Sequence, residues 1–308
     1  MVNNALSGRK LATFSQKEYQ STPFEKSGFY GANFSRPVIP DTQRQPENDI
    51  QLIHGDSLAL MTELAPESID LILSDPPYAI FSRKDDKLTG FDKPVDWQAF
   101  EDQVWEILKP DGQCLLFCDF ALLLKLRSEF SRLRFDFFHV IVKSSAMPKS
   151  KSHPLPDVEF LAIFRKGRFS KATFHPRMAM RTGEVYRKKN YIREISTRRM
   201  VKSEITENTD GSRWITQSLF MKSKPNLPAD ERTEHPFQKG LDLLRELVRV
   251  YSNQRDLILD PFAGSGSTLV AAYQEGRRAV GIEKDKHWYE IAAQRLATAT
   301  AQQRIFPY

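Results

Sequence analysis

Hydrophobic positions along the chain alternate between two periods from residue 49 to residue 299. Short apolar runs, each followed by a glycine, an acid or a proline, are typical of buried strands. Between them apolar residues recur at helical spacing, as at Leu241, Leu244, Val248 and Tyr251. Strands are expected at 49–56, 68–74, 113–119, 135–143, 157–167, 256–261 and 278–285, and helices at 57–66, 97–112, 121–133, 240–252, 268–276 and 287–299. The alternation predicts an α/β fold, a doubly wound and mostly parallel sheet with helices on both faces.

Two segments lack this pattern. Residues 1–47 are polar and interrupted by glycines and prolines, which predicts an N-terminal arm without a core of its own. Residues 165–234 show little periodicity and separate the two α/β halves. We therefore expect four parts: an arm (1–47), a first α/β half (48–164), an insert (165–234) and a second α/β half (235–308).

Positive charge is concentrated in the insert. The whole chain of 308 residues carries 45 Lys and Arg against 39 Asp and Glu, a net charge of +6. The stretch 165–224 alone holds 16 Lys and Arg against 5 Asp and Glu, or +11, so the remainder carries −5. A charged run is ordinarily a solvated face, but the size of this imbalance favours nucleic acid as a partner. Aromatic residues are interleaved with it: Phe169, Phe174, Tyr186, Tyr191, Trp214 and Phe220.

Several classes of protein are disfavoured. No run of 18 apolar residues is present and the N-terminus has no hydrophobic signal region, so a secreted or membrane protein is not expected. Cys114 and Cys118 lie in an apolar run and are interpreted as buried, reduced strand thiols. The six histidines show no ligand spacing, so no metal site is expected. The sequence predicts a cytoplasmic protein.

A glycine loop follows the strand at 256–261. In ILDPFAGSGST (258–268), Gly264 and Gly266 allow a ligand to approach the backbone, and Glu283 follows Gly266 by 17 residues, where a carboxylate suits ribose hydroxyls. The pattern alone also fits a nicotinamide site or a plain turn. However, the three-glycine fingerprint is incomplete, and Asp260 would repel a pyrophosphate but attract a cation. A positively charged nucleoside such as S-adenosylmethionine therefore fits better.

The strand at 68–74 ends in a second unusual stretch, Asp75-Pro76-Pro77-Tyr78. Taken alone, this could be a simple turn after a strand. Together with the glycine loop it resembles the catalytic motif of DNA amino-methyltransferases. Three further stretches resemble that family: DPFAGSG (260–266), HPFQKG (235–240) and the run FDKPVDWQAFEDQVWEILKPDGQCLLF (91–117). The catalytic motif precedes the insert and the glycine loop comes last, an order that resembles the β group. Gly240 departs from the family, which usually has proline there.

The resemblance covers roughly residues 48–300 and implies a Rossmann-like methyltransferase fold in which the insert recognises the target. It also implies that S-adenosylmethionine is the cofactor. In this reading Asp75 and the Pro76 carbonyl accept the two N–H bonds of an exocyclic amine, Pro77 fixes the turn, and Tyr78 stacks on the base. The implied cofactor-binding residues are Asp56, His235, Gln238, Lys239, Asp260, Phe262, Ala263, Gly264, Ser265, Gly266, Thr268 and Glu283. Asp56 could equally cap the helix at 57–66, and Lys239 could be a solvated side chain.

The expected activity is methylation of adenine N6 in double-stranded DNA, with the base flipped out of the duplex. The D in D-P-P-Y favours adenine in this family. Cytosine N4, an RNA or protein amine methyltransferase and a catalytically silent DNA-binding protein stay open as alternatives. The expected nucleic-acid contacts are Lys149, Lys151, Arg177, Arg181, Arg187, Lys188, Lys189, Arg198 and Arg199. A cognate restriction endonuclease and a second copy of the chain would suit the family as protein partners, although the sequence itself indicates neither.

Overall fold

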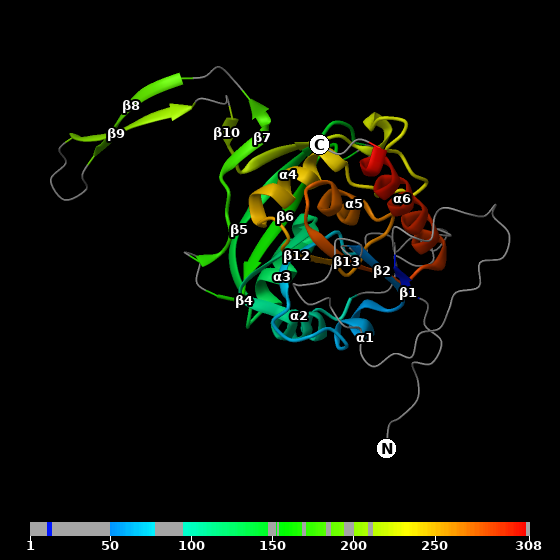
Figure 1. Ribbon diagram of the computed structural model, residues 1–308. Coiled ribbons are helices and arrows are strands. Elements are labelled where there is room, and N and C mark those ends of the chain that lie inside the picture. Colours follow the sequence, from blue (N-terminus) through cyan, green and yellow to red (C-terminus); the bar gives the residue numbers. More distant parts are fainter. Residues whose placement is uncertain are drawn as a thin grey trace.

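The computed structural model describes residues 11–13, 50–77, 95–146, 152, 154–167, 171–182, 186–193, 200–208 and 212–305 (Figure 1). Tyr78, Lys149, Lys151, Arg198 and Arg199 lie outside these residues, as does nearly all of the expected arm. For β1, for residues 177–213 and for the end of the last helix, only the course of the backbone is described.

The described part of the chain is built on one large mixed sheet of nine strands, in the order β1-β2-β13-β12-β3-β4-β6-β5-β11. The central five strands run parallel, whereas β6 is antiparallel to both of its neighbours. Their bounds are β1 Leu11–Thr13, β2 Ile50–His54, β3 Ile69–Ser74, β4 Leu108–Cys118, β5 Arg134–Lys143, β6 Val158–Arg165, β11 Ser218–Met221, β12 Leu257–Asp260 and β13 Arg278–Glu283. Every strand expected from the hydrophobic pattern is therefore present, and the doubly wound α/β prediction is confirmed.

Helices cover both faces of this sheet (Figure 1). One face carries α1 (Ser57–Met61), α2 (Trp97–Ile107) and α3 (Phe120–Glu129), and the other carries α4 (Leu241–Tyr251), α5 (Ser267–Gln274) and α6 (Lys286–Ile305). Several helices are shorter than expected, α1 and α2 most of all. The helix expected at 57–66 ends at Met61, after which Glu63 and Leu64 bond to carbonyls three residues back. The helix expected to reach Pro110 ends at Ile107, because Leu108 already pairs with Ile69 in the sheet.

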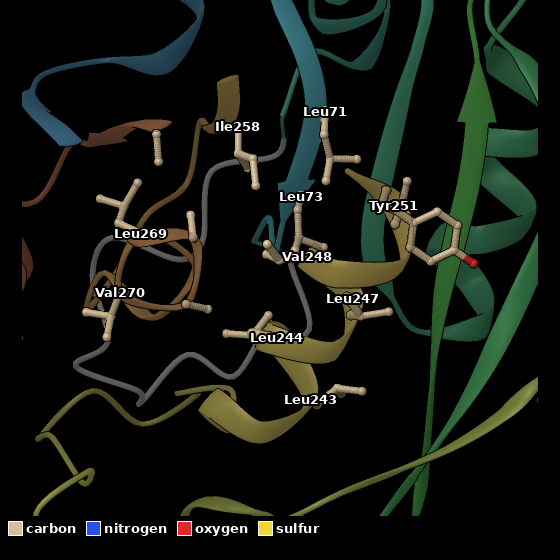
Figure 2. Close-up of a cluster of buried hydrophobic side chains, with 14 of the residues drawn as sticks. Leu71, Leu73, Leu243, Leu244, Leu247, Val248, Tyr251, Ile258, Leu269 and Val270 are labelled. Atoms are coloured by element: carbon tan, nitrogen blue, oxygen red, sulfur yellow. The ribbon is translucent and has the colours of Figure 1, made fainter. Parts of the chain in front are cut away.

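The core is divided by the sheet into two layers. On the α4 side, Leu244 and Val248 lie toward α5 and toward Leu71 and Leu73 of β3 (Figure 2). All four side chains are buried: the two of α4 recur at helical spacing, and the two of β3 alternate along the strand. On the other face, Cys114 and Cys118 are buried in β4, which confirms that they are reduced strand thiols.

The strand order reverses between β12 and β3. From β12 the chain proceeds through α5 to β13 on one side, whereas from β3 it proceeds through α2 to β4 on the other. In open α/β sheets, ligands bind where the order reverses, at the carboxyl ends of the strands. That edge of the sheet is therefore the expected location of a site.

The insert, residues 165–234, forms two small sheets and also contributes a strand to the large sheet. Strands β7 (Arg177–Thr182) and β10 (Ser212–Trp214) pair with each other, as do β8 (Tyr186–Arg193) and β9 (Met200–Asn208). The β8–β9 hairpin projects away from the body (Figure 1). The chain then returns as β11, which pairs with β5, and enters the short 3₁₀ helix η3 (Lys224–Asn226). None of the helices in the described ranges has the length and hydropathy that a membrane span requires.

Glu101 of α2 holds the turn between α3 and β5. Its carboxylate is fully buried and accepts hydrogen bonds from three backbone N–H groups, those of Ser131 (3.0 Å), Arg132 (2.8 Å) and Leu133 (2.8 Å). Asp102, the next residue, is half exposed and pairs with the Arg132 side chain at 3.2 Å.

Replacing Glu101 with alanine should lower the free energy of unfolding by about 3 kcal/mol, because three buried N–H groups lose a charged acceptor. Asp102→Ala is the matched control and should cost less than about 1 kcal/mol, as an exposed ion pair does. Equilibrium unfolding in urea measures both. Equal losses in the two variants would contradict the role given to Glu101.

Candidate active site

Two sequence motifs meet at the point where the strand order reverses. Strands β3 and β12 pair in parallel, with Leu71 opposite Ile258. The Ser74 hydroxyl donates a hydrogen bond of 2.5 Å to the Asp260 carboxylate, across 186 residues of sequence. Asp75 follows Ser74 and the glycine loop follows Asp260, so the catalytic motif and the glycine loop start side by side.

The corner at Asp75 contains a lysine. Asp75 lies just beyond the end of β3, and Pro76 behind it is buried. The Lys239 ammonium lies 2.8 Å from an Asp75 carboxylate oxygen and is itself only 8% exposed. The sequence predicts that Lys239 contacts the cofactor or is solvated. The structure buries Lys239 beside the proposed catalytic acid, so the solvated alternative is wrong, and its contact with the cofactor stays a prediction.

Lys239 is shared with a second carboxylate. Glu159, near the start of β6, lies 3.1 Å from the Lys239 ammonium and 3.3 Å from that of Lys143. Burial opposes the charge on Lys239, but the two carboxylates together raise its pKa above the ordinary value. Burial likewise opposes the charge on Glu159, yet Lys239 and Lys143 lower its pKa. Lys239 and Glu159 are therefore both charged near neutral pH.

The glycine loop is shaped by two residues with positive φ. Gly264 (φ 51°) and Gly266 (φ 76°) adopt left-handed conformations that favour glycine. A Cβ atom on Gly264 would lie 3.1 Å from Nε2 of His235, and one on Gly266 would lie 3.1 Å from Cβ of Ala292. The loop can therefore come close to the His235 ring on one side and to α6 on the other only because it carries no side chains there.

Glu283 at the end of β13 fastens this loop. Its carboxylate accepts hydrogen bonds from the N–H groups of Gly264 and Asp285, both at 2.7 Å. Burial nevertheless raises the pKa of Glu283 to about 7. Burial also raises the pKa of Asp260 to about 6, against the hydrogen bonds that Ser74, Thr268 and the Phe262 N–H donate to it. Two buried carboxylates near neutrality form a place where a cation would be stabilised.

The other loop residues named from the sequence lie in the same turn. The Phe262 ring stacks on Phe100 of α2, with ring centroids 5.9 Å apart. Ala263, Ser265 and Thr268 are buried. The sequence predictions for these residues thus fall within one compact structural unit, and their contact with a cofactor stays a prediction.

Asp56 has the capping role that the sequence left open. It is the N-cap of α1, and its carboxylate accepts a hydrogen bond from the Ala59 N–H at 3.3 Å. Lys284, directly after Glu283, lies 2.8 Å from the other oxygen of Asp56 and lowers its pKa. Asp56 therefore lies next to the end of β13, where a nucleoside bound by Glu283 would be close.

His235 and Gln238 belong to the segment that leads into α4. The amide of Gln238 accepts from the Thr233 N–H at 2.7 Å and donates to the Glu231 carbonyl at 2.8 Å, so its described contacts lie inside this segment. The His235 ring lies edge-on to Trp288, 4.6 Å between centroids, and over Gly264. Burial lowers the pKa of His235 to about 4, so the ring is neutral.

The five basic residues named from the sequence that the structure describes fall on the small strands of the insert. Arg177 and Arg181 lie on β7, and Arg187, Lys188 and Lys189 lie on β8. These residues therefore belong to the two small sheets outside the large one, and their contact with nucleic acid stays a prediction.

Sequence reasoning missed Glu159 and Lys143. It looked for acids that follow parallel strands, whereas Glu159 lies near the beginning of an antiparallel strand. Because β6 runs opposite to β4, with Phe160 paired to Cys118, its first residues lie at the carboxyl edge of the sheet. Glu159 lies in DVEF, at the start of one expected strand, and Lys143 lies in VIVK, at the end of another. Knowing that β6 is antiparallel would have been enough to place them there.

The residues present fit S-adenosyl-L-methionine. This compound carries a sulfonium and an ammonium group next to a nucleoside. The site offers a loop with glycines at 264 and 266, a ribose-compatible acid in Glu283 and a buried carboxylate in Asp260. A Cβ atom at Gly264 would fill the approach to His235.

Comparison with known proteins agrees with this geometry. A family model described as DNA methylase, N6_N4_Mtase, matches residues 69–294, well over half of the chain. The type II methyltransferase M2.DpnII of Streptococcus pneumoniae is 26% identical over 267 residues, covering 81% of this chain and 90% of that protein. M2.LlaDCHI of Lactococcus lactis subsp. cremoris is 27% identical over 269 residues, with 82% and 90% covered.

Solved structures support the Rossmann-like fold. The M1.HpyAVI–SAM complex matches with a TM-score of 0.54 and 24% identity, covering 80% of this chain and 99% of that one. The cytosine-N4-specific PvuII DNA methyltransferase matches with a TM-score of 0.55 and 19% identity, with 80% and 86% covered. From the family match, the chain belongs to the N6/N4 DNA methylase family and is a DNA methyltransferase.

Proposed function

We propose that this chain transfers the methyl group of S-adenosyl-L-methionine to N6 of adenine in double-stranded DNA. The observation that carries the proposal is the meeting of Asp75 with the glycine loop, through the Ser74–Asp260 hydrogen bond of 2.5 Å. An acid that accepts hydrogen bonds and a loop suited to a cationic nucleoside are thereby adjacent. Methyl transfer to an amine requires both.

Asp75 and Pro76 orient the amine. The lone pair of an exocyclic amine is delocalised into the ring, so the nitrogen must pyramidalise to attack. The Asp75 carboxylate accepts one N–H and the Pro76 carbonyl accepts the other, which directs the lone pair out of the base plane. Pro77 has no N–H to compete for these acceptors. The amine must also lose one proton when its nitrogen is methylated, and Asp75, which holds that N–H, passes the proton to solvent.

The base must leave the duplex to reach this corner. Asp75 is 23% exposed and is bordered by buried Pro76 and Lys239, so a stacked base could not present its amine there. Extruding the nucleotide from the duplex would bring its amine to Asp75. From the resemblance of D-P-P-Y, we expect Tyr78 to stack on the extruded base.

S-adenosyl-L-methionine supplies the reactive methyl group from its sulfonium when bound. Glu283 would accept hydrogen bonds from the ribose hydroxyls and Asp56 would lie beside the adenine, while His235 covers the loop at Gly264. The Asp260 carboxylate is buried and that of Glu283 is partly buried, so their negative charge attracts a cation more strongly than it would in water.

Adenine is favoured over cytosine by Asp75 itself, because D-P-P-Y is typical of N6 enzymes and S-P-P-Y of N4 enzymes. Cytosine N4 is the second candidate, since its amine has the same two N–H donors and the family includes both activities. The positive charge of the insert supports DNA as the substrate.

Mass spectrometry of nucleosides tests the choice of base. DNA from cells that express the protein, digested to nucleosides, should contain N6-methyladenine and no N4-methylcytosine above the level in cells that express Asp75→Ala. N4-methylcytosine in place of N6-methyladenine would overturn the adenine assignment and leave the family intact.

Asp75→Ala should lower kcat by at least about 100-fold, because the amine loses its charged acceptor. The dissociation constant for S-adenosyl-L-methionine should stay within about threefold of wild type, since Asp75 contacts the target nucleobase and not the cofactor in this proposal. Single-turnover methylation and isothermal titration calorimetry measure the two quantities. Retained methyl transfer in this variant would contradict the mechanism.

Cofactor affinity should fall as the pH falls through 7. In the free protein Glu283 has a pKa of about 7, so at pH 6 it is mostly protonated, whereas ribose hydroxyls and a cationic ligand prefer the carboxylate. The dissociation constant should therefore rise about tenfold from pH 8 to pH 6. Calorimetry across this range measures it. Glu283→Gln should bind more weakly at pH 8 and show a flatter pH dependence; an equally steep dependence in that variant would assign the titration to another group.

A further inference from the structure

The buried lysine in the catalytic corner forms ion pairs with two carboxylates. Its ammonium nitrogen lies 2.8 Å from Asp75 and 3.1 Å from Glu159. The same nitrogen lies 5.0 Å from the centroid of the Phe117 ring on β4, which adds a cation–π contact. Strands β3, β4 and β6 therefore all contribute to holding one cation.

We infer that Lys239 and Glu159 form a positioning pair for Asp75: Lys239 fixes the direction of the Asp75 carboxylate, and Glu159 shares the lysine's charge so that Asp75 can still accept a hydrogen bond from the target amine. The inference rests on the proposed function and adds two residues to it. Neither residue touches the reacting atoms in this scheme.

Orientation is the first part of the argument. Asp75 directly follows the last residue of β3, and its side chain rotates about two torsions. An ammonium that is itself held by Glu159 and Phe117 restricts those torsions before the base arrives. Preorganised acceptors lose little free energy of reorganisation when the substrate binds.

Charge sharing is the second part. A lysine paired with Asp75 alone would compete strongly with the target amine for the same carboxylate, because a buried ion pair is little screened. Glu159 divides the attraction of Lys239 between two acids. Lys143, 3.3 Å from Glu159, in turn balances the second acid, so two cations and two anions alternate across β3, β6 and β5. The low pKa of Glu159 and the high pKa of Lys239 keep this alternation through the working pH range.

Three variants test the inference: Lys239→Met, Glu159→Gln and the double variant. Lys239→Met should lower kcat by about 100-fold, the size expected when a catalytic group loses its alignment. Glu159→Gln, which preserves shape, should lower kcat by about tenfold. In all three the dissociation constant for S-adenosyl-L-methionine should stay within about threefold. The double variant should be no slower than Lys239→Met alone, because Glu159 acts only through Lys239.

Lys109→Met is the matched control. Lys109 forms a 2.5 Å ion pair with Asp70 at the opposite edge of the sheet, and its loss should leave kcat and cofactor binding unchanged. Thermal unfolding of each variant reports folding. If Lys239→Met is too unstable, Glu159→Gln alone decides the question through its kcat.

Two results would overturn the inference. A dissociation constant raised more than tenfold in Lys239→Met, with kcat at saturating cofactor within twofold of wild type, would assign Lys239 to the cofactor. Losses in kcat that multiply in the double variant would show that the two residues act independently. Because kcat is measured on whichever base the wild-type enzyme methylates, the inference can fail while the adenine assignment stands, and the reverse.

Discussion

The site depends on the register between β3 and β12. These neighbouring strands carry the catalytic motif and the glycine loop, and the hydrogen bond from Ser74 to Asp260 joins them at the point where both strands end. A shift of two residues in this pairing would keep the same side chains buried but move Asp75 along the strand by about 6.6 Å. That displacement exceeds any hydrogen bond. Core packing alone therefore does not fix the position of Asp75. The hydrogen bond from Ser74 to Asp260 at the strand ends fixes it.

Several acidic side chains lie at the carboxyl edge of the sheet, and they fall into two groups according to their partners. Asp56, Asp75 and Glu159 are each paired with a lysine: Lys284, Lys239 and, for Glu159, both Lys239 and Lys143. Asp260 and Glu283 receive only hydrogen bonds from hydroxyl and backbone groups among their described contacts, and their pKa values rise to about 6 and about 7. The negative charge not matched by a protein cation thus lies at the glycine loop, where a cationic methyl donor would bring the missing charge.

Much of the fold could be predicted from periodicity, because alternating strands and helices leave few topologies for a parallel sheet. The edge acids Asp75, Asp260 and Glu283 followed from the same rule. The partner of Lys239 could not be predicted: a lysine in HPFQKG and an acid in DVEF are 80 residues apart, and only the antiparallel course of β6 brings them together. The helix after β2 was overestimated because Leu64, although buried, follows a tight turn rather than a helical one. Tertiary pairing decided the first of these cases and a local turn decided the second.

The corner around Asp75 and the insert are connected through three strands of the large sheet, β5, β6 and β11. The chain leaves the large sheet at the end of β6, forms β7 to β10 and returns as β11 beside β5. After β11, Ser223 bonds to Ser144 and Ser145, which follow Lys143 on β5, and the chain reaches Lys239 sixteen residues later. Strand β6, which leads into the insert, thus carries Glu159 near its start, and β11, which leads out of the insert, pairs with the strand that ends at Lys143. Lys239 follows in the segment after β11, so the ion pairs around Asp75 draw on the strands on both sides of the insert.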